Sequence, residues 1–230
     1  RITSSAPPPG SPAVPLVACD PYFSIWSFSD ELAKDWPRHW TGAIHALSST
    51  IRVDGKPFRL MGMEPRDVPA ANQLALRVLP TRTFYDFEAA GVRLRLTFTT
   101  PALPHDLDLL ARPVTYLTWD VEASDGREHA VQLYYDHSAE PAVNTPDQGV
   151  VWSRLDVPGF RSVRFGSHEQ PVLKKKGDNL RIDWGYLYVA VPDGAPAALG
   201  VYAHEAARGS FAQAGTLPDK PDDRMPRAAK

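Results

Sequence analysis

The sequence predicts an all-β protein, a two-sheet antiparallel β-sandwich with long loops and little helix. Twenty-three prolines and fifteen glycines are spread through the 230 residues and separate short segments in which apolar and polar residues alternate. A period of two is typical of strands that bury one face, and roughly ten such segments with hairpin-sized links favour two sheets packed face to face. A chain of this length can form one sandwich domain.

The clearest strand is Val92–Phe98. Its alternation places four apolar side chains on a core face and turns Arg93, Arg95 and Thr97 toward water. We therefore expect this strand to have one buried and one solvated face.

Residues 50–61 predict a hairpin. Asp54 and Gly55 lie between two strand-like halves, and an Asp-Gly pair supplies the positive φ angles that a type I′ turn requires. Pro57 cannot donate a hydrogen bond to a ladder, so its side of the hairpin should lie at a sheet edge.

Further strands are expected wherever alternation recurs between turn residues. Helix should be scarce, and the best short helical candidate is Asp30–Asp35, where Asp30 could cap the helix before Pro37 stops it. The other expected strands are Gln73–Val78, Thr81–Phe87, Val114–Val121, His129–Tyr135, Val150–Arg154, Ser162–Phe165, Arg181–Val191 and Leu199–His204.

The composition along the chain suggests three parts. Residues 1–13 are polar and rich in proline, which is typical of a flexible segment. The sandwich domain is expected over residues 14–208. Residues 209–230 are polar and lack a strand pattern, so we expect a linker or a truncated end there.

The charge balance and the cysteine content exclude several classes of function. Lysine and arginine total 25 against 27 acidic residues, a formal net charge of −2, and no basic patch for nucleic acid is expected. The single cysteine, Cys19, excludes an intrachain disulfide and a cysteine-cluster zinc site. No apolar run reaches the roughly 18 residues of a membrane span, so none is expected.

No motif for a cofactor or a metal is found. His204–Arg208 begins like a zinc-protease helix but lacks the second histidine that would share the helix face. Pro104–Asp108 lacks the glycine and the terminal glutamate of a calcium loop, so a solvated turn is favoured. Nucleotide-binding loops and nucleophile elbows are absent. The sequence thus predicts neither a cofactor nor a metal.

Two short segments carry side chains suited to a pocket. His39 and Trp40 lie in a non-strand stretch, where they could line a polar pocket or fold over the core as a lid. Asp136, His137 and Glu140 end a strand and have the residue types of acid–base catalysts. No spacing rule shows that they converge, and turn chemistry at a strand end is favoured for them.

Asp183 is the unusual residue of a stretch that is otherwise apolar or aromatic. Burying a lone carboxylate would cost several kcal/mol, so Asp183 is either paired by buried donors or placed for a ligand. We favour the first hypothesis, with Arg181 or backbone amides as the donors. In the second hypothesis Asp183 and Trp184 join His39 and Trp40 at a pocket or a domain interface.

An ordered set of motifs resembles the N-terminal domain of the glutaminase A family, found in secreted fungal and bacterial enzymes. The similarity runs from about residue 14 to about residue 228, and no single motif within it is diagnostic. The motifs are Val14–Ser27, His39–Gly42, Ile51–Lys56, Arg59–Gly62, Pro113–Trp119, Ala142–Pro146, Glu169–Leu173 and residues 177–186.

The resemblance implies a β-sandwich domain that precedes a helical toroid domain, in an L-glutamine amidohydrolase located outside the cell or in the periplasm. It implies a supporting domain that is not catalytic alone, with the helical domain as partner on the same or a separate chain and a small-molecule substrate at the interface. No catalytic residue is carried over from the family.

Two alternatives stay open at the level of sequence. One is an accessory sandwich domain of an enzyme similar to a glycoside hydrolase. The other is a carbohydrate-binding module in which Trp36, Trp40 and Trp184 form an exposed aromatic platform, and the exposure of those rings would distinguish it.

Overall fold

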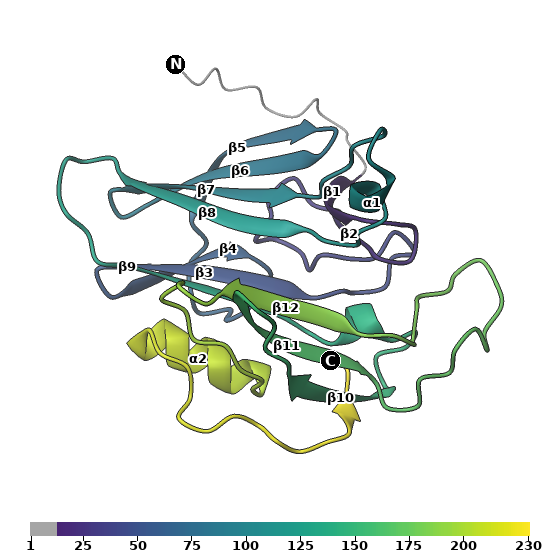
Figure 1. The fold of residues 1–230 in the computed structure, drawn as a ribbon. Helices are drawn as coiled ribbons and strands as arrows, with labels where there is room; N and C mark the ends of the chain where they lie inside the picture. The colour runs from purple at the N-terminus through teal and green to yellow at the C-terminus, as the bar shows by residue number, and fades with distance from the viewer. Residues whose placement is uncertain (1–12) are drawn as a thin grey trace. The chain divides into compact units, whose positions relative to one another are not determined.

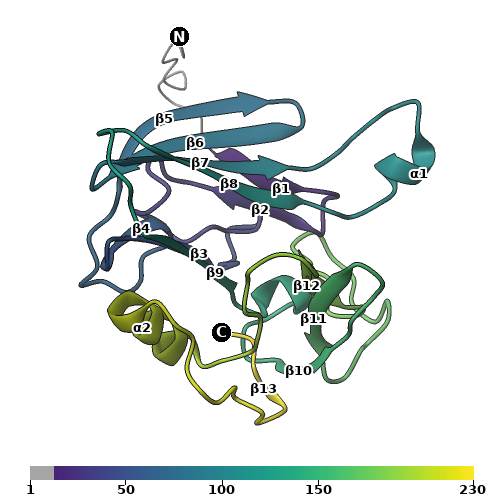
Figure 2. The same ribbon diagram turned by 60° about the vertical axis from the view of Figure 1, so that its left-hand side comes forward.

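The computed structural model describes residues 13–230, which are mainly strands (Figures 1 and 2). They form two compact units that divide between Asp136 and His137. The prediction of an all-β antiparallel fold with little helix is confirmed, and hydrogen bonding groups the described strands into four sheets rather than two. The flexible segment expected at residues 1–13 lies, up to residue 12, outside the described residues.

The first unit contains three of these sheets. Their strand orders are β5-β6-β7-β8, β4-β3-β9 and β1-β2. The elements are β1 (Val14–Ala18), β2 (Ser24–Ser27), β3 (Leu47–Val53), β4 (Lys56–Met61), β5 (Asn72–Leu79), β6 (Arg82–Ala89), β7 (Val92–Thr99), the short helix α1 (Leu107–Leu110), β8 (Tyr116–Ala123) and β9 (Val131–His137).

The core of the first unit lies between the β5–β8 sheet and the β4-β3-β9 sheet, which Figure 1 shows as two layers. The alternation predicted for β7 is confirmed on the inner face, where its four apolar residues are buried. Thr97, expected to face water, is buried, because it lies on a central strand between Phe84 and Thr118 of the neighbouring strands. The buried aromatic and leucine side chains of β6 and β7 are Tyr85, Phe87, Leu94, Leu96 and Phe98.

The predicted hairpin is confirmed as β3 and β4. Asp54 and Gly55 have φ angles of 49° and 83°, as a type I′ turn requires. β4 is an edge strand, and Pro57 lies on it opposite Arg52, in agreement with the expected edge position.

His129 ties this hairpin turn to the loop between β8 and β9. Its Nδ1 lies 2.7 Å from Asp54 Oδ2, and its Nε2 lies 3.0 Å from Asp125 Oδ1. Ionised carboxylates only accept hydrogen bonds, so both ring nitrogens carry a proton and the ring is an imidazolium. Asp125 and Asp54 raise the pKa of His129, and the histidine lowers the pKa of both carboxyls.

The second unit is built on one four-stranded sheet with the order β12-β11-β10-β13. A second α-helix follows β12, and a short 3₁₀ helix precedes β10. The elements are η1 (Glu140–Ala142), β10 (Gly149–Arg154), β11 (Phe160–Ser167), β12 (Leu187–Pro192), α2 (His204–Ala214) and β13 (Arg227–Ala228).

Two predicted strands of the second unit are wrong. Of Arg181–Val191, only the part from Leu187 onward is a strand, and the expected strand Leu199–His204 is irregular chain that leads into α2. Helix formers dominate α2, which buries Ala207, Arg208 and Phe211 on one face and continues past the expected boundary at residue 208.

The short helix expected at Asp30–Asp35 is also wrong. These residues form turns, with one bond of 3.1 Å from the Lys34 N–H to the Glu31 carbonyl. The chain then leaves the turn to make a two-way backbone bridge between Arg38 and Trp26, at 2.7 and 2.8 Å. Bridge formation leaves too few residues for a helix to propagate.

A core truncation tests the layer packing. Leu96→Ala should lower the free energy of unfolding by about 2–5 kcal/mol, because Leu96 is fully buried between the layers. Leu79→Ala, at an exposed leucine at the end of β5, should change it by less than about 0.5 kcal/mol. Chemical denaturation followed by tryptophan fluorescence measures both, and equal losses would contradict the assigned core.

A pH series tests the His129 contacts. The raised pKa of His129 means that its stabilisation is complete below about pH 6.5 and is lost as the pH rises through the higher folded value. The lowered carboxyl pKa values mean that the contribution of Asp54 and Asp125 is present above about pH 4. The urea midpoint of His129→Gln should therefore fall well below wild type near about pH 6 and approach it near about pH 9.

His105→Gln is the matched control, because His105 is exposed in an irregular segment. Its urea midpoint should follow wild type at both pH values. A His129→Gln deficit that is the same at the two pH values would show that the ring acts by packing rather than by its charge.

Candidate functional site

The residues proposed for a pocket or interface fall in both units. His39, Trp40 and Asp136 belong to the first unit, and His137, Glu140, Asp183 and Trp184 belong to the second.

His39 is fully buried and organises its own loop. Its Nε2 lies 3.0 Å from the Pro21 carbonyl, and its Nδ1 accepts from the Thr41 backbone N–H at 3.3 Å. This pattern assigns a proton to Nε2. Trp40 donates its Nε1–H to the same carbonyl at 2.6 Å, and 47 % of the residue remains exposed.

The other two tryptophans named for an aromatic platform are partly buried. Trp36 packs against Gly62, where an added Cβ would lie 2.7 Å from the indole. Trp184 occupies a bend ahead of β12 and is also partly covered. Of the three rings, only that of Trp40 belongs to an exposed residue.

Ser138 connects two of the acid–base candidates. Its hydroxyl donates to Glu140 Oε2 at 2.6 Å, and its carbonyl accepts from His137 Nδ1 at 2.7 Å. Glu140 is buried at the start of η1, and the His137 ring packs on Phe165 with centroids 4.8 Å apart. Sequence reasoning missed Ser138, although a serine two residues before a glutamate is a common local bonding pattern. Asp136 is partly buried in β9 of the other unit.

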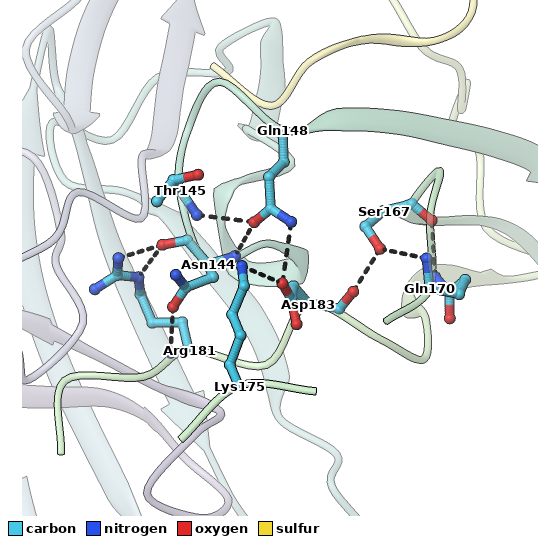
Figure 3. Close-up of polar contacts among 8 residues, drawn as sticks. All are labelled: Asn144, Thr145, Gln148, Ser167, Gln170, Lys175, Arg181 and Asp183. Atoms are coloured by element: carbon cyan, nitrogen blue, oxygen red, sulfur yellow. Dashed lines mark hydrogen bonds and ion pairs between the residues drawn. The ribbon is translucent and has the colours of Figure 1, made fainter. Parts of the chain in front are cut away.

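Asp183 is the buried centre of a polar network whose other members are mostly half-buried, which we call the Asp183 cluster (Figure 3). Only 3 % of Asp183 is exposed. Its Oδ2 accepts from Lys175 Nζ at 2.6 Å and from Gln148 Nε2 at 3.0 Å. The members of the cluster are Asn144, Thr145, Gln148, Ser167, Gln170, Lys175, Arg181 and Asp183.

The donors to Asp183 are not those expected. Arg181 turns away from the carboxylate, and its Nε donates to the Asn144 carbonyl at 2.8 Å. Its backbone N–H donates to Asn144 Oδ1 at 3.1 Å, and burial lowers the pKa of the guanidinium. Asp183 is thus paired within the protein, whereas the prediction was wrong about the donors: they are the exposed Lys175 and the half-buried Gln148, not Arg181 or backbone amides.

Gln148 joins Asp183 to the loop that precedes β10. Its Oε1 accepts from the backbone N–H groups of Asn144 and Thr145, at 2.7 and 3.0 Å. Its amide nitrogen is the group that reaches Asp183. One side chain therefore fixes the loop and satisfies the carboxylate, as Figure 3 shows.

The backbone of the Asp183 segment is held by Gln170 and Ser167. The Gln170 side-chain amide accepts from the Gly185 N–H at 2.7 Å and donates to the Gly185 carbonyl at 3.0 Å. Ser167 Oγ donates to the Asp183 carbonyl. Because a side-chain amide replaces a strand partner and Gly185 has a φ of 79°, the chain turns here instead of forming the expected strand.

The Asp183 cluster ties together three segments around residues 144–148, 167–175 and 181–185. The hydroxyl of Ser167 donates to a backbone carbonyl, so it is not arranged as a nucleophile beside a base. Among residues 13–230, no three His, Cys, Asp or Glu side chains are grouped so as to hold a metal ion. The Asp183 cluster can position the loops that it joins. Its exposed member is Lys175, whose side chain is 39 % exposed.

Residues 81–230 match the family described as "Domain of unknown function (DUF5127)", and this match covers well over half of the chain. The chain belongs to this family. The matched region includes the whole Asp183 cluster. Residues 9–71, which include the His39 loop, match a second family described as "Domain of unknown function (DUF4964)".

The chain is also similar to a protein named Glutaminase A from Aspergillus oryzae (strain ATCC 42149 / RIB 40). The two are 29 % identical over 233 residues, which cover 98 % of this chain and 33 % of that protein. The chain thus spans about a third of the length of the curated relative it matches. No helix among residues 13–230 is both long enough and apolar enough to cross a membrane.

Replacing Asp183 tests the positioning role. Asp183→Asn removes the charge that faces Lys175 and should lower the free energy of unfolding by about 1–3 kcal/mol, since one partner is partly solvated. Asp178→Asn, on an exposed aspartate of the same loop, should change it by less than about 0.5 kcal/mol. Urea denaturation measures both values. An unchanged stability in Asp183→Asn would point instead to a ligand role for the carboxylate.

Proposed function

We propose that this chain is the supporting part of a glutaminase-A-like amidohydrolase, which converts L-glutamine to L-glutamate and ammonia. The observation that carries the proposal is the extent of the similarity to the A. oryzae protein. It runs along 98 % of this chain but accounts for only 33 % of the relative. The remaining part of such an enzyme would then contain the catalytic groups.

The hydrogen bonds and ion pairs of the candidate residues favour a supporting, non-catalytic role for this chain. Amide hydrolysis needs an activated nucleophile or water together with donors for the oxyanion, converging in one pocket. Here the nitrogens of His39 are used within a loop, the hydroxyl of Ser138 binds Glu140, and Asp183 is bound by Lys175 and Gln148. These contacts build loops and strand ends rather than a reaction centre.

The proposal extends to the partner, the substrate and the location. The partner is the rest of the enzyme, on the same or a separate chain, and the substrate is a small molecule bound where the two parts meet. Its location is outside the cytoplasm, as the resemblance to the glutaminase A family implies. Loop-carried side chains such as Trp40 would lie at the interface.

A chimaera tests this proposal, in which residues 1–230 replace the matched third of A. oryzae Glutaminase A. The chain alone should release no ammonia from L-glutamine above the buffer rate. The chimaera should exceed the chain by at least about 100-fold, a difference that corresponds to roughly 2.7 kcal/mol of barrier. The A. oryzae protein with its matched third deleted, and the same protein intact, are the two controls.

Ammonia release by the chain alone would contradict the supporting role. If the chimaera released no ammonia while the intact A. oryzae protein was active, the result would contradict the relation to that enzyme. An active deletion variant would show that the matched third is dispensable for hydrolysis.

A further inference from the structure

The connection between β7 and β8 is longer than the sheet requires. Thr99 of β7 lies opposite Tyr116 of β8, so the strands are paired up to both ends of the connection. The β5–β6 and β6–β7 hairpins of the same sheet are closed by residues 80–81 and 90–91 alone. Residues 100–115, which we call the β7–β8 arm, are therefore an insertion that strand pairing does not need.

The arm is ordered by polar contacts of its own. The Asp106 carboxylate caps α1 by accepting from the Leu109 N–H at 2.9 Å. At the base of the arm, the hydroxyl oxygens of Thr100 and Thr115 lie 2.7 Å apart. No residue of α1 is buried, so the shape of the arm does not come from apolar packing.

Four aliphatic side chains of the arm face solvent, and Figure 2 shows α1 on a loop that extends beyond the ends of β7 and β8. Their exposed fractions are 51 % for Leu103, 73 % for Leu107, 45 % for Leu110 and 41 % for Val114. Isolated exposed apolar side chains are ordinary, whereas these four are gathered on one insertion that the sheet does not need. An ordered segment that exposes four aliphatic side chains to solvent is suited to insertion into a groove.

We propose that the β7–β8 arm docks into an apolar groove on the rest of the glutaminase-A-like enzyme and fastens the supporting part to it. This inference rests on the proposed function, which supplies the occupant. The similarity to the A. oryzae protein leaves two thirds of that relative unmatched, and the matched region of this chain includes the arm.

The size of the arm favours this occupant over a second copy of the chain. A stable complex between separate proteins buries about 800 Å² on each side, and a few exposed leucines offer only a few hundred Å². Two parts of one chain, as in the A. oryzae relative, can be held by a smaller contact, because tethering raises the effective concentration of the two surfaces.

Thiol labelling in the chimaera tests the docking. Leu107→Cys places a thiol on the most exposed leucine of the arm, in a Cys19→Ala background that removes the native thiol. The maleimide labelling rate at residue 107 should be at least about tenfold slower in the chimaera than in the chain alone. Leu79→Cys is the matched control, because Leu79 is 44 % exposed at the end of β5, and its rate should be the same in both proteins.

The labelling rates test the docking of the arm independently of whether the chimaera hydrolyses glutamine. Equal rates at residue 107 in the two proteins, or equal slowing at residues 107 and 79, would overturn the arm as the docking surface even in a chimaera that hydrolyses glutamine. Labelling of the chain alone that speeds up on dilution would identify a second copy as the occupant and would also overturn it. Slower labelling at residue 107 but not at residue 79, in a chimaera that does not hydrolyse glutamine, would support docking and contradict the proposed reaction.

Discussion

Burial of the inner face of β6 and β7 is the interaction on which the first unit depends. Five large side chains on these strands are almost completely removed from water, and each leucine and phenylalanine among them contributes about 1.5–3 kcal/mol by its burial. Their alternation fixes the register, since a slip of one residue would turn the whole set to solvent. The same register leaves residues 100–115 outside the sheet, so the geometry of the core determines where the arm begins and ends.

The second unit uses a polar constraint for a similar purpose. Its loops around residues 144–148 and 181–185 are held by side-chain bonds of Gln148, Gln170 and Asp183. A polar network around a buried carboxylate specifies one arrangement, because any alternative would leave that carboxylate without a partner. An aspartate can stand in this apolar and aromatic stretch because Lys175 and Gln148 of the same unit bind its carboxylate.

The sequence allowed prediction of those elements that local chemistry determines. The Asp54-Gly55 turn, the edge position of Pro57 and the buried face of β7 all follow from residues that are adjacent or alternate along the chain. The partners of Asp183 could not be predicted in this way, because Gln148 lies 35 residues away and nothing in its own segment marks it. The missing first part of the expected strand Arg181–Val191 had the same origin, since the Gln170 side chain binds Gly185 in place of a neighbouring strand. In α2, the run of helix formers closed by Gly215 was a usable signal, but the strand-like residues before it favoured the wrong interpretation.

The view of this chain as a supporting part is tested most directly by its own affinity for the proposed substrate. Isothermal titration calorimetry of residues 1–230 with L-glutamine measures that affinity without reference to any partner. The account predicts no saturable heat at L-glutamine concentrations up to several millimolar, above the roughly 1 μM to 1 mM range typical of enzyme substrates. Saturable binding in that range, with one site per chain, would contradict the account and place a substrate site within this chain.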